Sequence, residues 1–232
     1  MRTQETEEMR TQPLFAAASA TTVEAILAAS FLQRFPARVD LVREGEPADF
    51  LHLVVDGQVE IFAGWNGRET TISIVGAGTS FIVAAVLLDR VYLKSARSLT
   101  PSRILLMPAE IIRRCFVLDA GLAQALAREL ALAYRGLVKE LKSQKLRSGL
   151  ERLANWLIAH DDVTGRRGSF DLPFDKKVLA SRLGMAPEVL SRALASLESY
   201  EVTVKGPRIE LHDREALRRL ARPDATIDDP LA

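Results

Sequence analysis

A proline-free stretch from Asp119 to about Arg147 constrains the fold of this chain more than any other feature. Within it, leucine or alanine recurs at steps of 4, 4, 3, 4 and 4 residues, at Leu122, Leu126, Leu130, Ala133, Leu137 and Leu141. This heptad-like spacing predicts one helix on the order of 40 Å long. Its apolar stripe is buried either within one subunit or in the seam of a parallel dimer. Because a small domain covers only part of such a stripe, we expect a dimer seam made of Leu122, Leu126, Leu130, Leu137 and Leu141.

The sequence before this helix has the pattern of a small antiparallel β-roll. From Val39 to Met107, short apolar and β-branched runs alternate with turn signals spaced by about ten residues. Asp56-Gly57 predicts a hairpin between the apolar runs on either side of it, and Asn66-Gly67 predicts the next turn. Ala16 to Phe35, ahead of the roll, is typical of an amphipathic helical region.

Lys176 to Leu197 carries the pattern of a helix-turn-helix. Apolar residues line one face of a first helix, and Gly184-Met185-Ala186 interrupts it. Pro187 can start a second helix, because its missing N–H would be unpaired there in any case. The second helix needs a buried side, supplied at positions i, i+3, i+4 and i+7 by Leu190, Ala193, Leu194 and Leu197.

The other side of the second helix carries Glu188, Ser191 and Arg192. These three project together from the first turn, the part of a recognition helix that reaches base edges. Arginine can contact guanine at two atoms, glutamate can accept from cytosine, and serine can pair with more than one base. The alternative is an ordinary surface ion pair between Glu188 and Arg192. Four more cations are expected to contact DNA: Lys176, Lys177, Arg182 and Lys205.

Two alternating runs around Lys205-Gly206-Pro207 predict a β-hairpin, so that the C-terminal part has the pattern of a winged helix. The predicted fold class is α+β. We expect an N-terminal β-roll with a helical segment in residues 1–118, a long dimerisation helix in 119–147, and a winged helix-turn-helix with an acidic C-terminal tail in 148–232.

The net charge of +1 conceals an asymmetry along the chain. Residues 1–133 carry a net −2, residues 134–222 a net +6, and the last ten residues a net −3. The basic stretch is where a polyanion such as DNA would bind. A solvated helix-rich domain also reaches such a charge without binding anything, so charge alone leaves both interpretations open.

The composition excludes several classes of protein. Cys115 is the only cysteine, which rules out a disulfide framework and an iron–sulfur cluster held by cysteines. His52, His160 and His212 lie far apart, unlike the ligands of a cupin-like metalloenzyme. The longest apolar run, Phe81 to Leu88, is too short to span a bilayer. We therefore expect a cytoplasmic, non-enzymatic protein with no membrane partner and no assigned metal site.

The order of parts resembles the CRP/FNR family of bacterial transcription regulators over about residues 14–220. Residues 45–59, GEPADFLHLVVDGQV, are similar to the family's GExxxxxYxVxxGxV pattern, with His52 replacing an aromatic residue, and EVLSR at 188–192 is similar to the ExxSR signature of the FNR-like branch. The resemblance implies a homodimer with a sensory, cyclic-nucleotide-binding-like roll. It also implies a TTGAT-like palindrome in double-stranded DNA, read in major grooves about 34 Å apart, and RNA polymerase as a partner if the protein activates.

The roll departs from family members that bind cyclic AMP. The resemblance implies a Gly-Glu pair at the start of a short helix and an Arg-Ser pair further on. We place these at Gly78-Thr79 and near Tyr92-Leu93, followed by Lys94-Ser95, so that the glutamate and the arginine are missing. Thr79 and Ser80 would still offer a helix N-terminus to a phosphate. Because an unpaired buried phosphate is costly, we expect an effector other than cyclic AMP. The alternative is a cyclic-nucleotide-responsive regulator with a divergent pocket.

The remaining pattern resembles the nitric-oxide-responsive, denitrification-type (DNR/NnrR-like) branch, several members of which are linked to haem. The marker is LKSQKLRS at 141–148 followed by ERLA at 151–154. The resemblance makes haem a candidate cofactor, with His52 or His160 as its ligand, although each also fits as an ordinary structural histidine. We expect a neutral, apolar or gaseous effector in a pocket between roll and long helix, lined by Phe81, Tyr92 and Tyr134.

Overall fold

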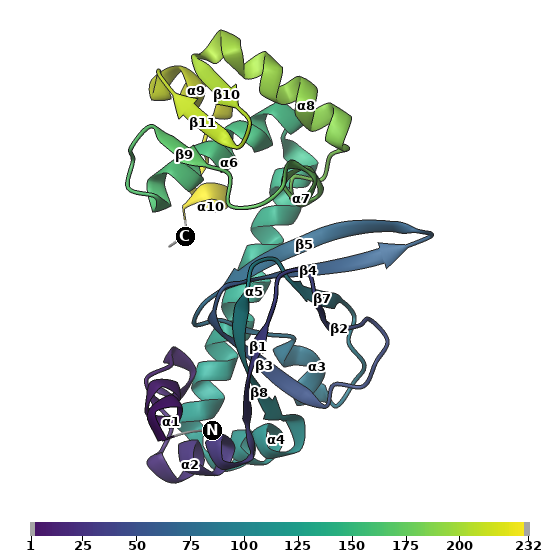
Figure 1. The fold of residues 1–232 in the computed structure, drawn as a ribbon, viewed down its shortest axis with the longest axis vertical. Coiled ribbons are helices and arrows are strands. Elements are labelled where there is room, and N and C mark those ends of the chain that lie inside the picture. Colours follow the sequence, from purple (N-terminus) through teal and green to yellow (C-terminus); the bar gives the residue numbers. More distant parts are fainter. Residues whose placement is uncertain (1–2, 230–232) are drawn as a thin grey trace. The chain divides into compact units, whose positions relative to one another are not determined.

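The computed structural model describes residues 3–229 and divides into two compact units, 1–134 and 135–232 (Figure 1). Each unit has its own hydrophobic core. The division falls within α5 (Ala120–Leu146), the long helix that the sequence predicted over 119–147. The last turns of this helix therefore belong to the second unit.

The first unit is built around a β-roll of two four-stranded antiparallel sheets, which confirms the predicted roll. The strand orders are β1-β8-β3-β6 and β2-β7-β4-β5. The first sheet contains β1 (Phe31–Phe35), β8 (Ser102–Pro108), β3 (Phe50–Asp56) and β6 (Ser80–Phe81). The second contains β2 (Asp40–Val42), β7 (Ser95–Ser98), β4 (Gln58–Trp65) and β5 (Arg68–Gly76).

The two predicted glycine turns differ in what they connect. At Asn66-Gly67 both residues are left-handed (φ +48° and +74°), as a two-residue hairpin turn requires, and Trp65 pairs with Arg68. The hairpin predicted at Asp56-Gly57 is wrong, because β3 pairs with β6 and β8 whereas β4 pairs with β5 and β7. The chain there crosses between sheets, and a Cβ on Gly57 would lie 2.3 Å from the hydroxyl of Ser102.

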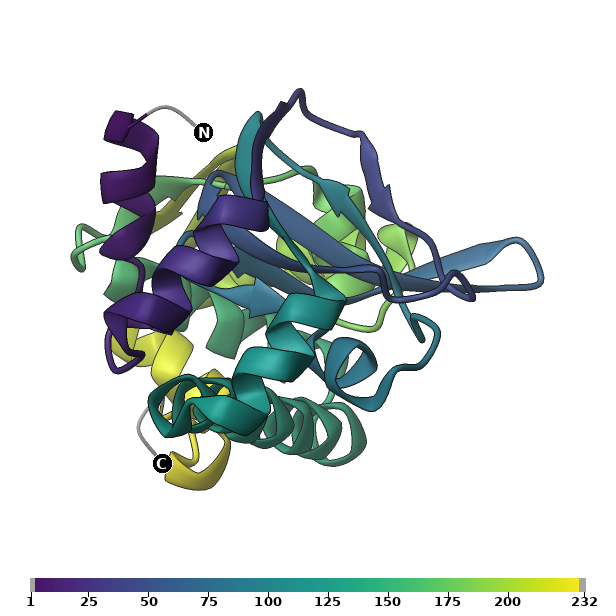
Figure 2. The same ribbon diagram turned by 90° about the horizontal axis from the view of Figure 1, so that it is seen from below.

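Helices complete the first unit, and Figure 2 looks onto three of them, α1, α2 and α4. They are α1 (Thr3–Arg10), η1 (Pro13–Phe15), α2 (Ala20–Ala29), α3 (Val83–Leu88) and α4 (Ala109–Leu118). The helix predicted to reach Phe35 ends at Ala29, and the next residues form β1. Ser30 ends the helix, because its backbone is extended while its hydroxyl donates to the carbonyl of Ile26 over 2.6 Å.

The start of α5 is fixed by Asp119. One carboxylate oxygen accepts from the backbone N–H of Leu122 over 2.9 Å, and the other accepts from the hydroxyl of Ser19 over 2.7 Å. These bonds, that from the Ser19 hydroxyl first, hold the pKa of Asp119 well below its ordinary value. Gly121 allows the close approach of the segment before α2, since a Cβ would clash with the carbonyl of Ala17.

The predicted dimer seam is wrong for its first two leucines. Leu122 and Leu126 are completely buried in the core of the first unit, so they stabilise their own chain. Leu130 is partly buried against the same core, whereas Leu137 and Leu141 are exposed. The core of the first unit therefore covers the leucine face over about the first three turns of α5, and the leucine stripe is open to a partner only in the later turns.

The second unit is the predicted winged helix. It continues from α5 through α6 (Gly149–Val163), β9 (Ser169–Asp171), α7 (Lys176–Arg182), α8 (Pro187–Ser196), η2 (Leu197–Tyr200), β10 (Val202–Lys205), β11 (Arg208–Leu211), α9 (Arg214–Ala221) and α10 (Ala225–Asp228). β9 adds a third strand, pairing with β11, to the two-stranded wing that the sequence predicted. The fully buried side chains at its centre are Leu153, Ala154, Leu157, Leu179, Ala180, Leu197, Ile209 and Leu217.

Candidate nucleic-acid interface

The turn of the helix-turn-helix is set by Gly184. Its backbone is left-handed (φ +62°), and a Cβ would lie 2.3 Å from the side-chain amide of Gln144. α8 then begins at Pro187, as predicted, and buries Leu190 and Leu194. The turn thus orients α8 while resting on the end of α5.

The predicted base-reading residues are exposed on α8. Glu188, Ser191 and Arg192 lie within about one turn, on the side away from the buried leucines. Among the ion pairs of residues 3–229, none joins Glu188 to Arg192. The face therefore presents a carboxylate, a hydroxyl and a guanidinium to solvent, the groups that recognise base edges in a major groove.

The flanking cations fall into two groups. Lys176 and Lys177 are exposed in the first turn of α7, and Lys205 is exposed at the wing, with its ammonium 3.6 Å from a carboxylate oxygen of Glu210. Arg182 is only half-exposed, and burial lowers its pKa against the opposing effect of Glu140 on α5. The contact of Arg182 with DNA therefore stays a prediction, made for a side chain that is less accessible than the three lysines.

Arg152 on α6 supports the turn and was missed by the sequence reasoning. Its Nε donates to the carbonyl of Leu183 over 2.8 Å, and its Nη1 donates to the carbonyl of Arg147 over 2.7 Å. One side chain thus joins the end of α5 to the end of α7. In the sequence, Arg152 stands directly before the apolar residues of a helix. Such an arginine by itself predicts only a side chain with its charge in water.

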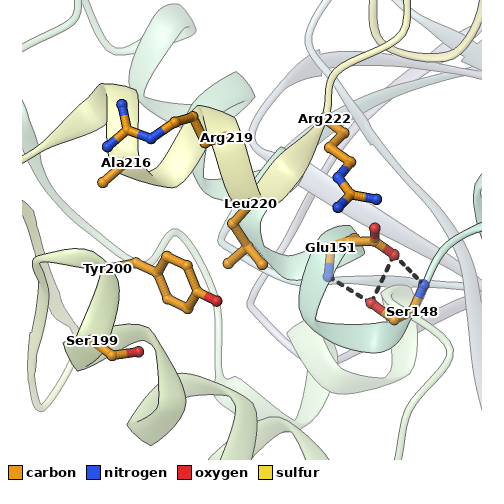
Figure 3. A pocket seen from close by; sticks show the side chains of 8 residues that line it. All are labelled: Ser148, Glu151, Ser199, Tyr200, Ala216, Arg219, Leu220 and Arg222. Atoms are coloured by element: carbon orange, nitrogen blue, oxygen red, sulfur yellow. Dashed lines mark hydrogen bonds between the residues drawn. The ribbon is translucent and has the colours of Figure 1, made fainter.

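A cleft of about 530 Å³ lies elsewhere in the second unit (Figure 3). It is lined by Ser148, Glu151, Ser199, Tyr200, Ala216, Arg219, Leu220 and Arg222. Glu151 is occupied by capping α6, since it accepts from the backbone N–H of Ser148 over 2.8 Å while the Ser148 hydroxyl accepts from the N–H of Glu151 over 3.2 Å. The remaining charge in the cleft is basic, from Arg219 and Arg222.

In the roll, the short helix begins later than predicted. α3 starts at Val83, after Ile82 in a left-handed conformation (φ +65°), whereas Ser80 already belongs to β6. The prediction that Thr79 and Ser80 form a helix N-terminus is therefore wrong. The observed start of α3, the Ile82-Val83 step, also carries no carboxylate.

The three aromatic residues predicted to line an effector pocket are not alike. Phe81 is buried and stacks on His52, with ring centroids 5.0 Å apart. Tyr92 is buried, and its hydroxyl donates to the carbonyl of Phe50 over 3.2 Å. Tyr134 is 68% exposed on α5, so it lines no enclosed pocket in the single chain.

The two candidate haem ligands differ in exposure, since His52 is buried and His160 is only partly buried. His52 is 3% exposed, its Nδ1 has no hydrogen-bond partner, and burial lowers its pKa to about 4. His160 lies between Trp156, stacked at 5.0 Å, and Phe170, edge-on at 4.7 Å. Because haem iron binds a ring nitrogen, the burial of His52 leaves no room for a haem at that residue in this conformation, whereas the role of His160 stays a prediction. Within residues 3–229 no cluster of three or more metal-ligating side chains occurs, and no helix is long and apolar enough to cross a membrane.

Glu129, in the first unit, is a buried acidic residue that the sequence reasoning missed. It lies on α5, its Oε2 is buried without a hydrogen-bond partner, and burial raises its pKa. Its signal in the sequence was weak, since an acidic residue within a charged helix normally faces water.

Two family patterns match this chain. The cyclic nucleotide-binding domain matches residues 32–118, and the Crp-like helix-turn-helix domain matches residues 151–220. Fold and matches together define a class of regulators that join a cyclic-nucleotide-binding roll to a DNA-binding helix-turn-helix. The chain belongs to the CRP/FNR family of DNA-binding transcription regulators.

Similar proteins come from several bacteria. The CRP-like cAMP-activated global transcriptional regulator of Mycobacterium tuberculosis (strain H37Rv) is 25% identical over 194 residues, which cover 81% of this chain and 87% of that protein. A regulatory protein from Silicibacter pomeroyi DSS-3 is 28% identical, with a TM-score of 0.60 over 94% of this chain and 100% of that one. FixK2 from Bradyrhizobium japonicum shares the fold, with a TM-score of 0.73 at 21% identity over 84% of this chain and 99% of that one.

Proposed function

We propose that the protein is a cytoplasmic regulator that binds a TTGAT-like palindrome as a homodimer. The exposed, unpaired face of Glu188, Ser191 and Arg192 carries this proposal, because these side chains could contact base edges without first breaking an ion pair. Lys176, Lys177 and Lys205 would contact phosphates on either side. RNA polymerase is a further partner if the protein activates transcription.

The proposed dimer seam begins at Leu130. Leu130, Tyr134, Leu137 and Leu141 succeed one another on α5 at steps of 4, 3 and 4 residues, the spacing of a coiled-coil seam. Leu137 and Leu141 are 49% and 54% exposed, which leaves a run of large apolar side chains in water. A second copy of the same helix would cover them.

The proposed effector is neutral, apolar or gaseous. The start of α3 offers no carboxylate to a ribose, and Tyr92 stands near the position where the family pattern has an arginine. An anionic ligand would be desolvated without a matching charge. Nitric oxide sensing and the denitrification branch stay predictions from sequence resemblance.

A cyclic nucleotide is the second candidate. The family pattern over residues 32–118 and a relative named for activation by cAMP favour it. Lys94 adds a local reason, since it is half-buried beside Tyr92-Leu93 and burial lowers its pKa. An ammonium there could contact a phosphate in place of the missing arginine.

Calorimetry with cyclic AMP separates the two candidates. We expect no heat of binding at micromolar ligand, and a micromolar Kd that is lost in Lys94→Gln would establish the nucleotide sensor instead. Absorption spectra with and without added haem and nitric oxide test the branch assignment. A Soret band that shifts with nitric oxide would support the denitrification branch, and its absence would contradict it.

The DNA proposal is tested by fluorescence anisotropy on a TTGAT palindrome and on a duplex with both half-sites scrambled. We expect the palindrome to bind at least about 1000-fold more tightly at physiological salt. Equal affinities would remove the proposed recognition sequence while leaving general DNA binding intact.

A further inference from the structure

The last turns of α5 carry a basic face that the chain itself covers. Lys139 donates to the backbone carbonyl of Asp229 over 2.5 Å, and Lys142 donates to the hydroxyl of Thr226. Both terminal nitrogens of Arg147 donate to the carboxylate of Asp228, over 2.7 and 2.5 Å. We call Lys139, Lys142 and Arg147 the basic face, and residues 224–229, which include α10, the acidic segment.

The acidic segment is folded for this contact. Asp224 caps α10 by accepting from the N–H of Thr226 over 2.8 Å, and its own N–H donates to a carboxylate oxygen of Asp228 over 2.6 Å. The pKa of Asp224 is lowered most by the hydrogen bonds that it accepts from the side chain and the N–H of Thr226. The positive charges of Lys142 and Arg147 lower it further. Arg147 is left only 8% exposed and Asp228 25%. The contact thus withdraws an arginine from solvent and surrounds it with negative charge.

The basic face belongs to the unit that reads DNA and adjoins its turn. Gln144, on the same helical turns, lies against Gly184, and Arg152 bonds both the carbonyl of Arg147 and the end of α7. The N-terminus of α8, which carries Glu188, comes three residues after Gly184. A duplex engaged by α8 would therefore bring its phosphates near the end of α5.

We propose that the basic face is a second phosphate-binding surface for DNA, and that the acidic segment occupies it until DNA displaces it. The segment carries three aspartates in six residues, a density of negative charge that mimics a phosphate backbone. Three cations released from it would make three additional phosphate contacts. This inference rests on the DNA-binding function but not on the proposed recognition sequence.

The salt dependence of binding to non-specific duplex measures the contacts directly. In the full chain with Asp224→Asn, Asp228→Asn and Asp229→Asn, we expect the plot of log affinity against log salt to steepen by roughly 2–3, at about 0.9 per added phosphate contact. Asparagine is as good a helix cap as aspartate, so the substitution removes charge while keeping the cap at position 224. A slope equal to that of the wild type would overturn the proposal.

Two control sets separate this surface from general charge and from stability. Glu24→Gln, Glu44→Gln and Glu110→Gln make the same change in net charge on exposed carboxylates of the first unit, and should leave the slope unchanged. Lys139→Gln with Lys142→Gln should remove about two of the three added contacts in the triple variant and have little effect in the wild type, where the segment already covers both lysines.

The outcomes also distinguish this inference from the function beneath it. If wild type binds no duplex at any salt concentration, the DNA-binding function itself fails. If wild type binds and the triple variant only melts at lower temperature with the same slope, the acidic segment is a structural support and the inference fails. If the lysine substitutions already flatten the wild-type slope, the segment does not compete with DNA.

Discussion

The two units of this chain differ in the polarity and exposure of the residues at their proposed ligand sites. In the winged helix, Glu188, Ser191 and Arg192 are polar, exposed and available to a ligand. In the roll, the start of the short helix is the apolar Ile82-Val83 step, and Tyr92 is buried with its hydroxyl already bonded. The difference teaches that the polar groups expected of a ligand site can be present at the surface of one unit while the corresponding segment of the other unit is apolar or already hydrogen-bonded.

The largest predicted effect comes from disrupting the proposed pairing of two chains along α5. Leu137→Glu places a charge in the exposed stripe of α5 and should yield monomers. Affinity for the palindrome should fall on the order of 1000-fold, because one half-site offers too few contacts. Sedimentation and anisotropy measure the two effects, and Val163→Glu, at an exposed residue outside the stripe, is the matched control. A stable Leu137→Glu dimer would place the seam elsewhere.

The second prediction is confined to the roll. Burial lowers the pKa of His52 to about 4 from 6.5, so the unfolded chain takes up a proton before the folded one does. The stability of the roll is thus full above pH 6.5 and falls as the pH drops toward 4, by up to about 3 kcal/mol. His52→Phe should abolish this part of the pH dependence, measured by hydrogen exchange of β3. An unchanged pH profile in that variant would contradict the assignment.

The third prediction concerns the winged helix. Arg192→Ala should weaken binding to the palindrome by about 1–3 kcal/mol and relax the preference at the G·C pair, with little effect on non-specific duplex. Anisotropy on single-base variants of the site provides the measurement, with Arg167→Ala, at an exposed loop arginine, as control. Equal losses on all sequences would show that Arg192 contacts phosphate rather than a base.

Local signals in the sequence correctly predicted the turns and helix starts that depend only on the conformation of a few neighbouring residues. Asn66-Gly67 fixes its own turn through left-handed backbone, and Pro187 fixes the start of α8. Asp56-Gly57 carries the same kind of signal, yet it joins two sheets, because long-range pairing of β3 with β8 decides the register there. A turn dipeptide predicts that the chain reverses or bends, but it does not predict which strands pair on either side of the turn.

The residues of the candidate site likewise fall into those that the local sequence predicts and those that depend on contacts distant in the sequence. The exposed face of α8 follows from helical periodicity alone, so sequence suffices to find it. The burial of Leu122 depends on the core of the roll, and the cover over Arg147 comes from Asp228, which lies 81 positions further along the chain. Periodicity marks an apolar stripe or a basic run without saying what lies against it.

The smallest predicted effect sharpens the comparison of the two units under acid. Ser148→Ala removes the hydroxyl that caps α6 and should cost about 1 kcal/mol, whereas Ser148→Thr should restore most of it. The pKa of Glu151 is lowered, first by the backbone N–H and then by the hydroxyl of Ser148, so its contribution is present above pH 4.5 and is lost as the pH falls through the lower folded value. Between pH 6.5 and 4.5 the roll should therefore weaken through His52 while the capping box of α6 holds. Hydrogen exchange measured separately over β3 and α6 checks this order, and simultaneous loss of protection in both would contradict it.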